Sequence, residues 1–173
     1  MPASEFLSVV RSRRGIKRYL PKDVEEEKLQ KILEAVSHAP SARNQQPFRF
    51  LIVKDKTLKE NISKISFHND QKILEAPILV VAICNPSLAW KYPNEKDDTA
   101  LIDVAIALDH LSLSAAALGL GTCWMAKFEE EKLKELVGAK KEERIPIMMT
   151  LGYAAEIPEE KPRKKIEELF TKI

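Results

Sequence analysis

The amino-acid sequence predicts a single domain of the α+β class that spans residues 1–173. Its 173 residues are enough to bury a substantial core, and 45% of them are hydrophobic. Short β-branched and aromatic runs alternate along the chain with longer stretches of helical periodicity. We therefore expect three or four strands interleaved with five or six helices, packed as layers of one fold.

The first predicted helix covers Asp23–Pro40. Asp23 is placed to cap its N-terminus, with Glu26 three residues further on, and Pro40 ends it. Its apolar face, with side chains three or four residues apart, consists of Leu29, Ile32, Leu33 and Val36.

Three further helices are expected downstream. Residues 58–65 and 129–137 are amphipathic with helical spacing. Between them, residues 99–118 are almost wholly apolar, which is typical of a helix in the middle of a core or across a subunit interface. Gly119 and Gly121 can end this long helix with positive φ.

Four segments have the composition of strands. Residues 47–53 alternate in strand fashion, and residues 77–84 are continuously apolar, which predicts a central strand buried on both faces. Residues 122–126 and 145–154 are the other two. A charged C-terminal extension, 155–173, with one weak helix closes the chain.

Cations are concentrated near the N-terminus, where five occur within ten residues: Arg11, Arg13, Arg14, Lys17 and Arg18. A nucleic-acid backbone, a membrane surface, a phosphorylated cofactor or plain solvent could each be their partner. The chain has 28 Lys+Arg against 26 Asp+Glu, and the net charge of +2 is lower than is usual for a nucleic-acid-binding protein. The cluster is therefore local, and we expect no nucleic-acid partner.

Three features favour a cytoplasmic protein. Cys84 and Cys123 lie far apart in apolar surroundings, as reduced core cysteines do. The N-terminal residues include an early Glu and no long apolar segment, so they predict no signal peptide. The most apolar segment, residues 100–125, contains two aspartates and a histidine, which disfavours a membrane span.

The sequence does not contain the usual catalytic and nucleotide-binding motifs. The stretch Gly119–Thr122 contains G-x-G, but it follows a helix and Trp124 stands where a Rossmann motif has its third glycine. His38, His68 and His110 are scattered without metal-ligand spacing. Because no nucleophile stands in a recognisable setting either, the chemistry of an enzyme with this sequence would come from a cofactor.

Two other polar segments are candidates for binding. The hydroxyl, amide and cationic groups between Pro40 and Pro47 could hold a ligand or form a solvated connection. Lys161 and Arg163 form a second cationic pair. If the fold brings this pair to the N-terminal cations, the two form a phosphate pocket, because guanidinium groups bind phosphate oxygens bidentately and lysine adds a point charge.

In this order, the segments resemble the FMN-dependent nitroreductase family, in its short, flavin reductase-like form. The resemblance rests on the motifs SRRGIKRYL, APSARNQQPFRF, GLGTCWM and IPIMMTLGYAAEIPEEKPRKK, with NDQKILEAP as a weaker fifth. It implies a nitroreductase-like fold, with a central, mainly antiparallel sheet flanked by helices, in an intertwined homodimer. Residues 155–173 would then pack on the partner subunit.

The resemblance also implies an FMN site at the dimer interface. The phosphate and pyrimidine edge would be contacted by Arg13, Arg14, Gly15 and Lys17, and the phosphate also by Lys161 and Arg163. The flavin ring and ribityl chain bound by the partner subunit would be contacted by Pro40, Ser41, Ala42 and Asn44. The ring's polar edge would be contacted by Asn69 and Lys72, and its face near N5 by Cys123, Trp124 and Met125.

The implied activity is that of an oxidoreductase. NAD(P)H would be the transient donor of hydride to flavin N5, and a nitroaromatic, quinone or similar small acceptor would then take the electrons in a ping-pong mechanism. The protein would supply positioning and electrostatics, with no catalytic side chain and no metal. A flavin-binding storage or sensor protein with little turnover is the alternative.

Three features depart from the family pattern. Gly15 stands where many members have a serine, so one hydroxyl is missing. Lys127 stands where a small residue is common and could alter access near N5. The chain is short, and residues 90–94 form the only segment we expect to act as a lid.

Overall fold

Four antiparallel strands form the centre of the molecule. The computed structural model describes residues 2–68, 70–93 and 97–173. The strands are β1 (Phe48–Val53), β2 (Ile78–Cys84), β3 (Gly121–Met125) and β4 (Arg144–Gly152). They lie in the order β1-β2-β4-β3, and every neighbouring pair is antiparallel, so that β1 and β3 are the two edges.

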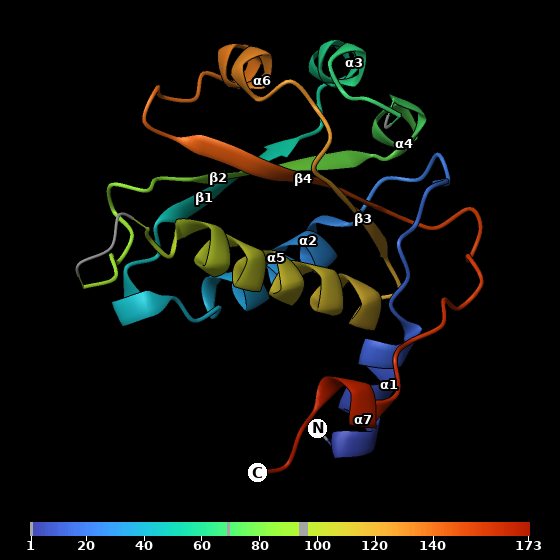
Figure 1. Cartoon of the computed structure of the whole chain (residues 1–173). Coiled ribbons are helices and arrows are strands. Elements are labelled where there is room, and N and C mark those ends of the chain that lie inside the picture. Colours follow the sequence, from blue (N-terminus) through green and yellow to red (C-terminus); the bar gives the residue numbers. More distant parts are fainter. Residues whose placement is uncertain (1, 69, 94–96) are drawn as a thin grey trace.

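Helices cover both faces of the sheet. The α-helices of the described residues are α1 (Ala3–Ser12), α2 (Glu26–Ser37), α3 (Lys56–Lys64), α4 (Asp70–Glu75), α5 (Ala100–Ala117), α6 (Glu130–Val137) and α7 (Ile166–Leu169). A 3₁₀ turn, η1 (Ala42–Asn44), precedes β1. In Figure 1, α2 and α5 lie under the sheet, α3, α4 and α6 lie above it, and α1 and α7 extend away from this body. The predicted α+β class and the antiparallel sheet flanked by helices are confirmed.

The sheet separates two apolar cores, because successive side chains of a strand point to opposite faces. Val80 of β2 packs in the core shared with α2 and α5, together with Leu108. Its neighbour Val81 packs in the other core, with Ile62 of α3 and Leu133 of α6. Every residue of β2 is buried, which confirms the prediction of a central strand covered on both faces.

Helix α5 is long and apolar enough to cross a membrane, by length and composition alone. Its position under the sheet accounts for that composition, since Val104, Leu108 and Leu111 are buried there. Core helices of soluble proteins pass the same test, so α5 is only weak evidence for a span. Its outer face remains exposed at Leu101 and Ile102.

The observed elements differ from the predicted ones mainly at the N-terminus. Helix α2 begins at Glu26, with Glu25 at the N-cap and no side-chain cap, so the prediction that Asp23 caps it was wrong. Helices α1 and α4 were not among the predicted helices. Helix α1 buries none of its residues, and α4 has only six residues, so neither has the long apolar face that identifies a helix in sequence.

The two glycines after α5 have different roles. Gly119 has a φ of 74° and ends the helix as predicted. Gly121 is not in the left-handed region, so the prediction of positive φ was wrong there. A Cβ at Gly121 would lie 2.3 Å from Cγ1 of Ile16. Glycine at this position allows the segment after α1 to lie directly against β3.

Candidate functional site

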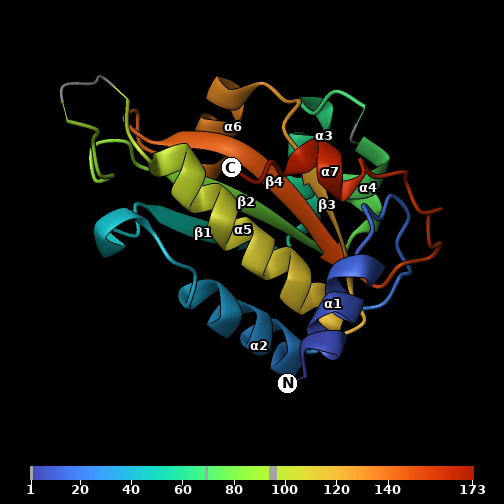
Figure 2. The ribbon, with the colours of Figure 1, turned by 60° about the horizontal axis from the view of Figure 1, so that its bottom comes forward.

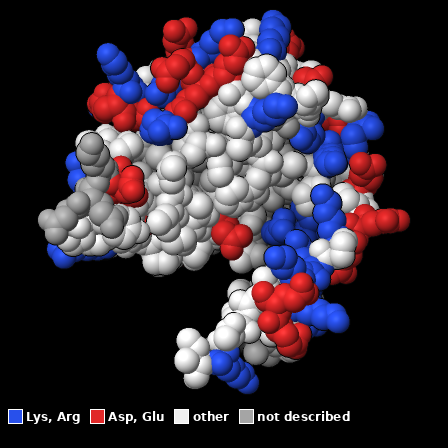
Figure 3. Space-filling model, in the orientation of Figure 1, with Lys and Arg blue, Asp and Glu red and all other residues white. Residues whose placement is uncertain are grey.

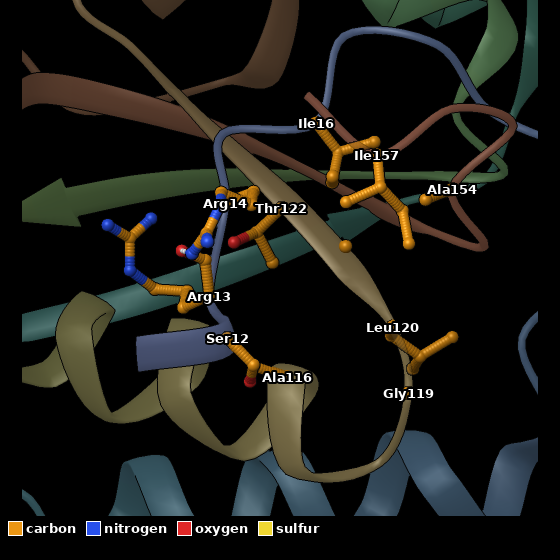
Figure 4. A pocket seen from close by; sticks show the side chains of 11 residues that line it. Ser12, Arg13, Arg14, Ile16, Ala116, Gly119, Leu120, Thr122, Ala154 and Ile157 are labelled. Atoms are coloured by element: carbon orange, nitrogen blue, oxygen red, sulfur yellow. Dashed lines mark hydrogen bonds between the residues drawn. The ribbon is translucent and has the colours of Figure 1, made fainter. Parts of the chain in front are cut away.

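A pocket of about 210 Å³ lies where the C-terminal end of α1, the end of α5 and the start of β3 meet. Its walls are mostly apolar, with Ala116, Leu120 and Ile157 among them, and its polar side is formed by Arg14 and Thr122 (Figure 4). It is the place where the N-terminal cationic segment meets the chain that follows β4.

The cationic segment is held beside β3 by backbone pairing. Gly15 and Thr122 form a parallel bridge, and the backbone N–H of Ile16 donates to the carbonyl of Thr122 at 2.9 Å. Further along, the Tyr19 hydroxyl lies 2.7 Å from Oγ1 of Thr150 and donates to the carbonyl of Ile16 at 3.0 Å. Burial raises the pKa of Tyr19, which stays protonated as an anchor.

Arg14 is oriented by several contacts. Its Nη1 donates to the carbonyl of Arg11 and, at 3.0 Å, to that of Arg13. Its Nη2 lies 3.3 Å from a carboxylate oxygen of Glu160. Among the described residues, its buried Nε has no hydrogen-bond partner. The guanidinium is therefore held by three contacts, while its buried Nε–H is left without a partner among the described residues.

Thr122 carries the second unpartnered polar atom. The residue is 2% exposed, and its Oγ1 has no hydrogen-bond partner among the described residues. Native structures rarely leave buried donors unpaired, because each costs roughly 1–3 kcal/mol. Two such donors lining one pocket indicate a site for a ligand that offers acceptor oxygens.

The structure brings the C-terminal extension to this pocket. Glu160 contacts Arg14 as described above, and it is followed directly by Lys161, with Arg163 two residues further on. Figure 3 shows Lys and Arg side chains gathered where α1 leaves the body of the molecule. The side chains of Lys161 and Arg163 are exposed, and their part in a shared phosphate pocket stays a prediction.

The other cations of the opening segment differ in their surroundings. Lys17 is exposed, and Arg13 is partly buried at the pocket. Arg18 donates from Nε to a carboxylate oxygen of Glu75 at 2.9 Å. Arg18 thus tethers the segment to α4 and is not available to a ligand in the same way as Arg13 and Arg14.

The segment with Pro40, Ser41, Ala42 and Asn44 lies at the opposite end of the molecule from α1 (Figures 1 and 2). One chain therefore does not bring it together with the pocket. A buried carboxylate anchors it: Asp103 of α5 accepts from the Ala42 backbone N–H and from the Thr99 hydroxyl, both at 2.9 Å.

The backbone of this segment is strained. Arg43, Asn44 and Gln46 have φ values of 51°, 56° and 48°, a conformation that costs side-chain-bearing residues free energy. The Arg43 guanidinium lies 5.9 Å from the ring centroid of Trp90, which packs edge-to-face on Tyr92 at 5.0 Å. The described part of the expected lid, residues 90–93, therefore lies close to Arg43.

Side chains of β3 divide between the two faces of the sheet. Met125 is buried in the core shared with α3 and α6, and Cys123 points to the same side by alternation. Trp124 is 37% exposed on the other side, the side of α5, together with Thr122. A ligand lying on this side of β3 would meet Trp124 and Thr122, and the backbone rather than the side chain of Met125.

The two residues predicted at the polar edge of the ring are Lys72 and Asn69. Lys72 is partly buried on α4. Asn69 lies outside the described residues. The residue that sequence reasoning missed is Thr122, although the period of two residues from Trp124 places it on the same face of the strand.

The donor set suits a phosphorylated cofactor. A phosphate group can accept from both donors that lack a partner, the Nε–H of Arg14 and the hydroxyl of Thr122. A volume of about 210 Å³ is below the roughly 300–1,000 Å³ of typical small-molecule sites, so the pocket is too small for a whole flavin nucleotide. The residues present fit the phosphate end of FMN.

Comparison with known proteins establishes the family. Residues 10–153 match the model of the Nitroreductase family. The protein belongs to the nitroreductase family. A protein of Archaeoglobus fulgidus, named provisionally as an NADH dehydrogenase/NAD(P)H nitroreductase, is 31% identical over 153 residues, which are 86% of this chain and 85% of the relative.

Solved structures of nitroreductases support the fold. A nitroreductase family protein of Clostridium novyi NT is 31% identical, with a TM-score of 0.79 over 86% of each chain. An FMN-dependent nitroreductase of Clostridium difficile R20291 is 26% identical, with a TM-score of 0.78 over 94% of this chain and 93% of that one. The expected nitroreductase-like fold is confirmed.

Proposed function

We propose that this nitroreductase family member is an FMN-dependent oxidoreductase that takes hydride from NAD(P)H and reduces a nitroaromatic, a quinone or a similar small acceptor. The observation that carries the proposal is the pocket in which Arg14 and Thr122 each present a buried donor without an acceptor. The names of the similar proteins support the choice of FMN and NAD(P)H.

The phosphate would be held by Arg13 and Arg14, with Lys161 and Arg163 supplied by the extension that reaches Arg14. Lys17 would face the pyrimidine edge, where a cation stabilises negative charge. Bound FMN would supply the redox chemistry, accepting hydride and passing electrons on. The protein's own part is to bind, orient and shield the cofactor.

A second copy of the chain would complete the site. Neither α1 nor α7 buries a residue, yet Phe6 and Leu7 of α1 and Leu169 of α7 are large apolar side chains that lie exposed. Exposed apolar area of this extent is typical of a protein interface. In the homodimer that we propose, the Pro40–Asn44 segment of one subunit reaches the pocket of the other, and residues 155–173 pack on the partner.

A visible absorption spectrum tests the proposal first. The purified protein should show a flavin spectrum that bleaches on anaerobic addition of NADH or NADPH. A flavin that stays oxidised would favour a storage or sensor protein, or another donor. If no flavin is present, even after incubation with FMN, the proposal fails.

The phosphate assignment has its own test. The double variant Arg13→Ala/Lys161→Ala should lose FMN affinity by at least about tenfold, because two charge-assisted contacts are removed. The control is Lys31→Ala/Lys132→Ala, which removes the same charge from exposed helix positions. Dissociation constants from flavin fluorescence decide, and full FMN occupancy in the Arg13/Lys161 variant would contradict the assignment.

A further inference from the structure

Thr122 has a hydroxyl that the folded chain does not use. Both the side chain and its Oγ1 are buried, and no described residue accepts or donates a hydrogen bond there. A valine of nearly the same shape would avoid the cost of burying an unpaired hydroxyl. The threonine therefore lowers the stability of the unliganded protein, and a ligand that pairs with it would compensate.

The position of Thr122 indicates where that ligand would bind. Its hydroxyl oxygen lies on the side of the Arg14 side chain, while the Arg13 guanidinium extends outward (Figure 4). Arg14, whose Nε is the second unpaired donor, lines the same pocket. A hydroxyl and a guanidinium N–H with no acceptor between them suit one oxyanion, since each can donate to it.

Gly15 leaves open space beside the residue that carries this hydroxyl. Gly15 is the bridge partner of Thr122, so the two residues lie side by side. A Cβ added at Gly15 would find no atom within 4 Å, so there is open space where a side chain could stand. Strand β3 thus places the Thr122 hydroxyl beside Gly15, a position of the cationic segment that has no side chain.

We propose that the Thr122 hydroxyl, together with Nε of Arg14, donates to a phosphate oxygen of FMN and replaces the hydroxyl that Gly15 lacks. This inference rests on the proposed function and adds a binding residue to it. Thr122 contacts the cofactor's phosphate and has no part in electron transfer.

The variant Thr122→Val makes two predictions of opposite sign. The flavin-free protein should gain a few degrees in Tm, because an unpaired buried hydroxyl is removed. Its affinity for FMN should fall by about tenfold or more, because a hydrogen bond to a charged group is lost. Binding of riboflavin, which has no phosphate, should not change.

Two further variants serve as controls. Thr122→Ser keeps the hydroxyl and should bind FMN as the wild type does. Gly15→Ser in the Thr122→Val background should restore FMN affinity, because it places a hydroxyl in the open space beside position 122. Calorimetric melting of the flavin-free proteins and fluorescence titrations with FMN and riboflavin measure all four proteins.

The outcomes separate this inference from the proposed function. If Thr122→Val weakens the binding of FMN and of riboflavin equally, or changes neither, Thr122 does not contact the phosphate. The proposed function would still stand in that case, provided that the wild type binds FMN. If the wild type binds neither flavin, the proposed function fails. The rise in Tm on addition of inorganic phosphate then still tests the pocket. If phosphate raises the Tm of the wild type and of Thr122→Val equally, the proposed oxyanion site is wrong.

Discussion

At the scale of single residues, Arg14 links three parts of the chain. It donates to the carbonyls of Arg11 and Arg13 at the end of α1, contacts Glu160 of the C-terminal extension and lines the pocket with a buried Nε that has no partner among the described residues. The Glu160 side chain is 69% exposed, so its ion pair with Arg14 contributes little to stability. It does, however, place a carboxylate where an anionic ligand would bind.

Glu160→Gln should therefore tighten FMN binding. Removing the competing carboxylate should increase affinity by about two- to fivefold, which corresponds to the free energy of an exposed ion pair. Glu159→Gln makes the same charge change one residue away and is the control. Titrations of the flavin-free proteins with FMN would contradict the idea if the two variants behave alike.

Residue-scale features were only partly predictable from sequence. Arg13 and Arg14 stand out because cations are dense around them. Thr122 does not, because the absence of a hydrogen-bond partner is a property of the folded chain. The role of Gly121 was also hidden, since it depends on the approach of Ile16, more than a hundred positions earlier in the sequence.

At the scale of elements, a core helix positions a distant loop. Asp103 lies in the first turn of α5 and accepts hydrogen bonds from Ala42 and Thr99. It thus ties the strained segment that contains Arg43 to the most deeply packed helix. The carboxylate gives the loop an acceptor from a largely apolar helix.

Asp103→Ala should destabilise the fold by about 2–4 kcal/mol, because two hydrogen bonds to a buried carboxylate are lost and their donors stay unpaired. Asp103→Asn retains an acceptor and should cost less. Asp109→Ala removes an exposed carboxylate from the same helix and should change stability by less than about 0.5 kcal/mol. Urea denaturation gives the three values, and equal losses for Ala at both positions would exclude the anchoring role.

Elements with a core-facing pattern were predicted well. The continuous apolar run of β2 is visible in the sequence because the strand is buried on both faces, and the long apolar stretch of α5 is visible because one face of that helix packs in the core. Helix α1 was missed for the opposite reason. With no residue buried within one chain, its apolar positions have no partner that sequence reasoning on a single chain can assign.

At the scale of the whole molecule, carboxylates with lowered pKa values couple stability to pH. A hydrogen bond from Tyr153, with smaller contributions from its own backbone and from Lys22, lowers the pKa of Glu25 from 4.5 to about 2. The hydrogen bond from Arg49 lowers that of Glu143, with the Lys140 backbone N–H assisting against burial. Both groups bind protons more weakly when folded than when unfolded.

The contribution of these two carboxylates to the free energy of unfolding should therefore be fully present above about pH 4.5 and decrease as the pH falls toward 2. The reason is that the folded protein stabilises only their ionised forms. Tyr153→Phe should make this decrease shallower by raising the pKa of Glu25. Tyr92→Phe, which removes a hydroxyl elsewhere, is the control. Urea midpoints between pH 2 and 7 measure the effect, and parallel curves for Tyr153→Phe and wild type would contradict it.

The lack of buried residues in α1 and α7 also has a consequence for the order of events during folding. The sheet and its five covering helices can close around their cores without either terminal helix. If the apolar faces of the terminal helices find their contacts on a second copy, they become ordered only when two chains meet. Refolding should then show a fast phase that is independent of protein concentration, followed by a slower one whose rate rises with it.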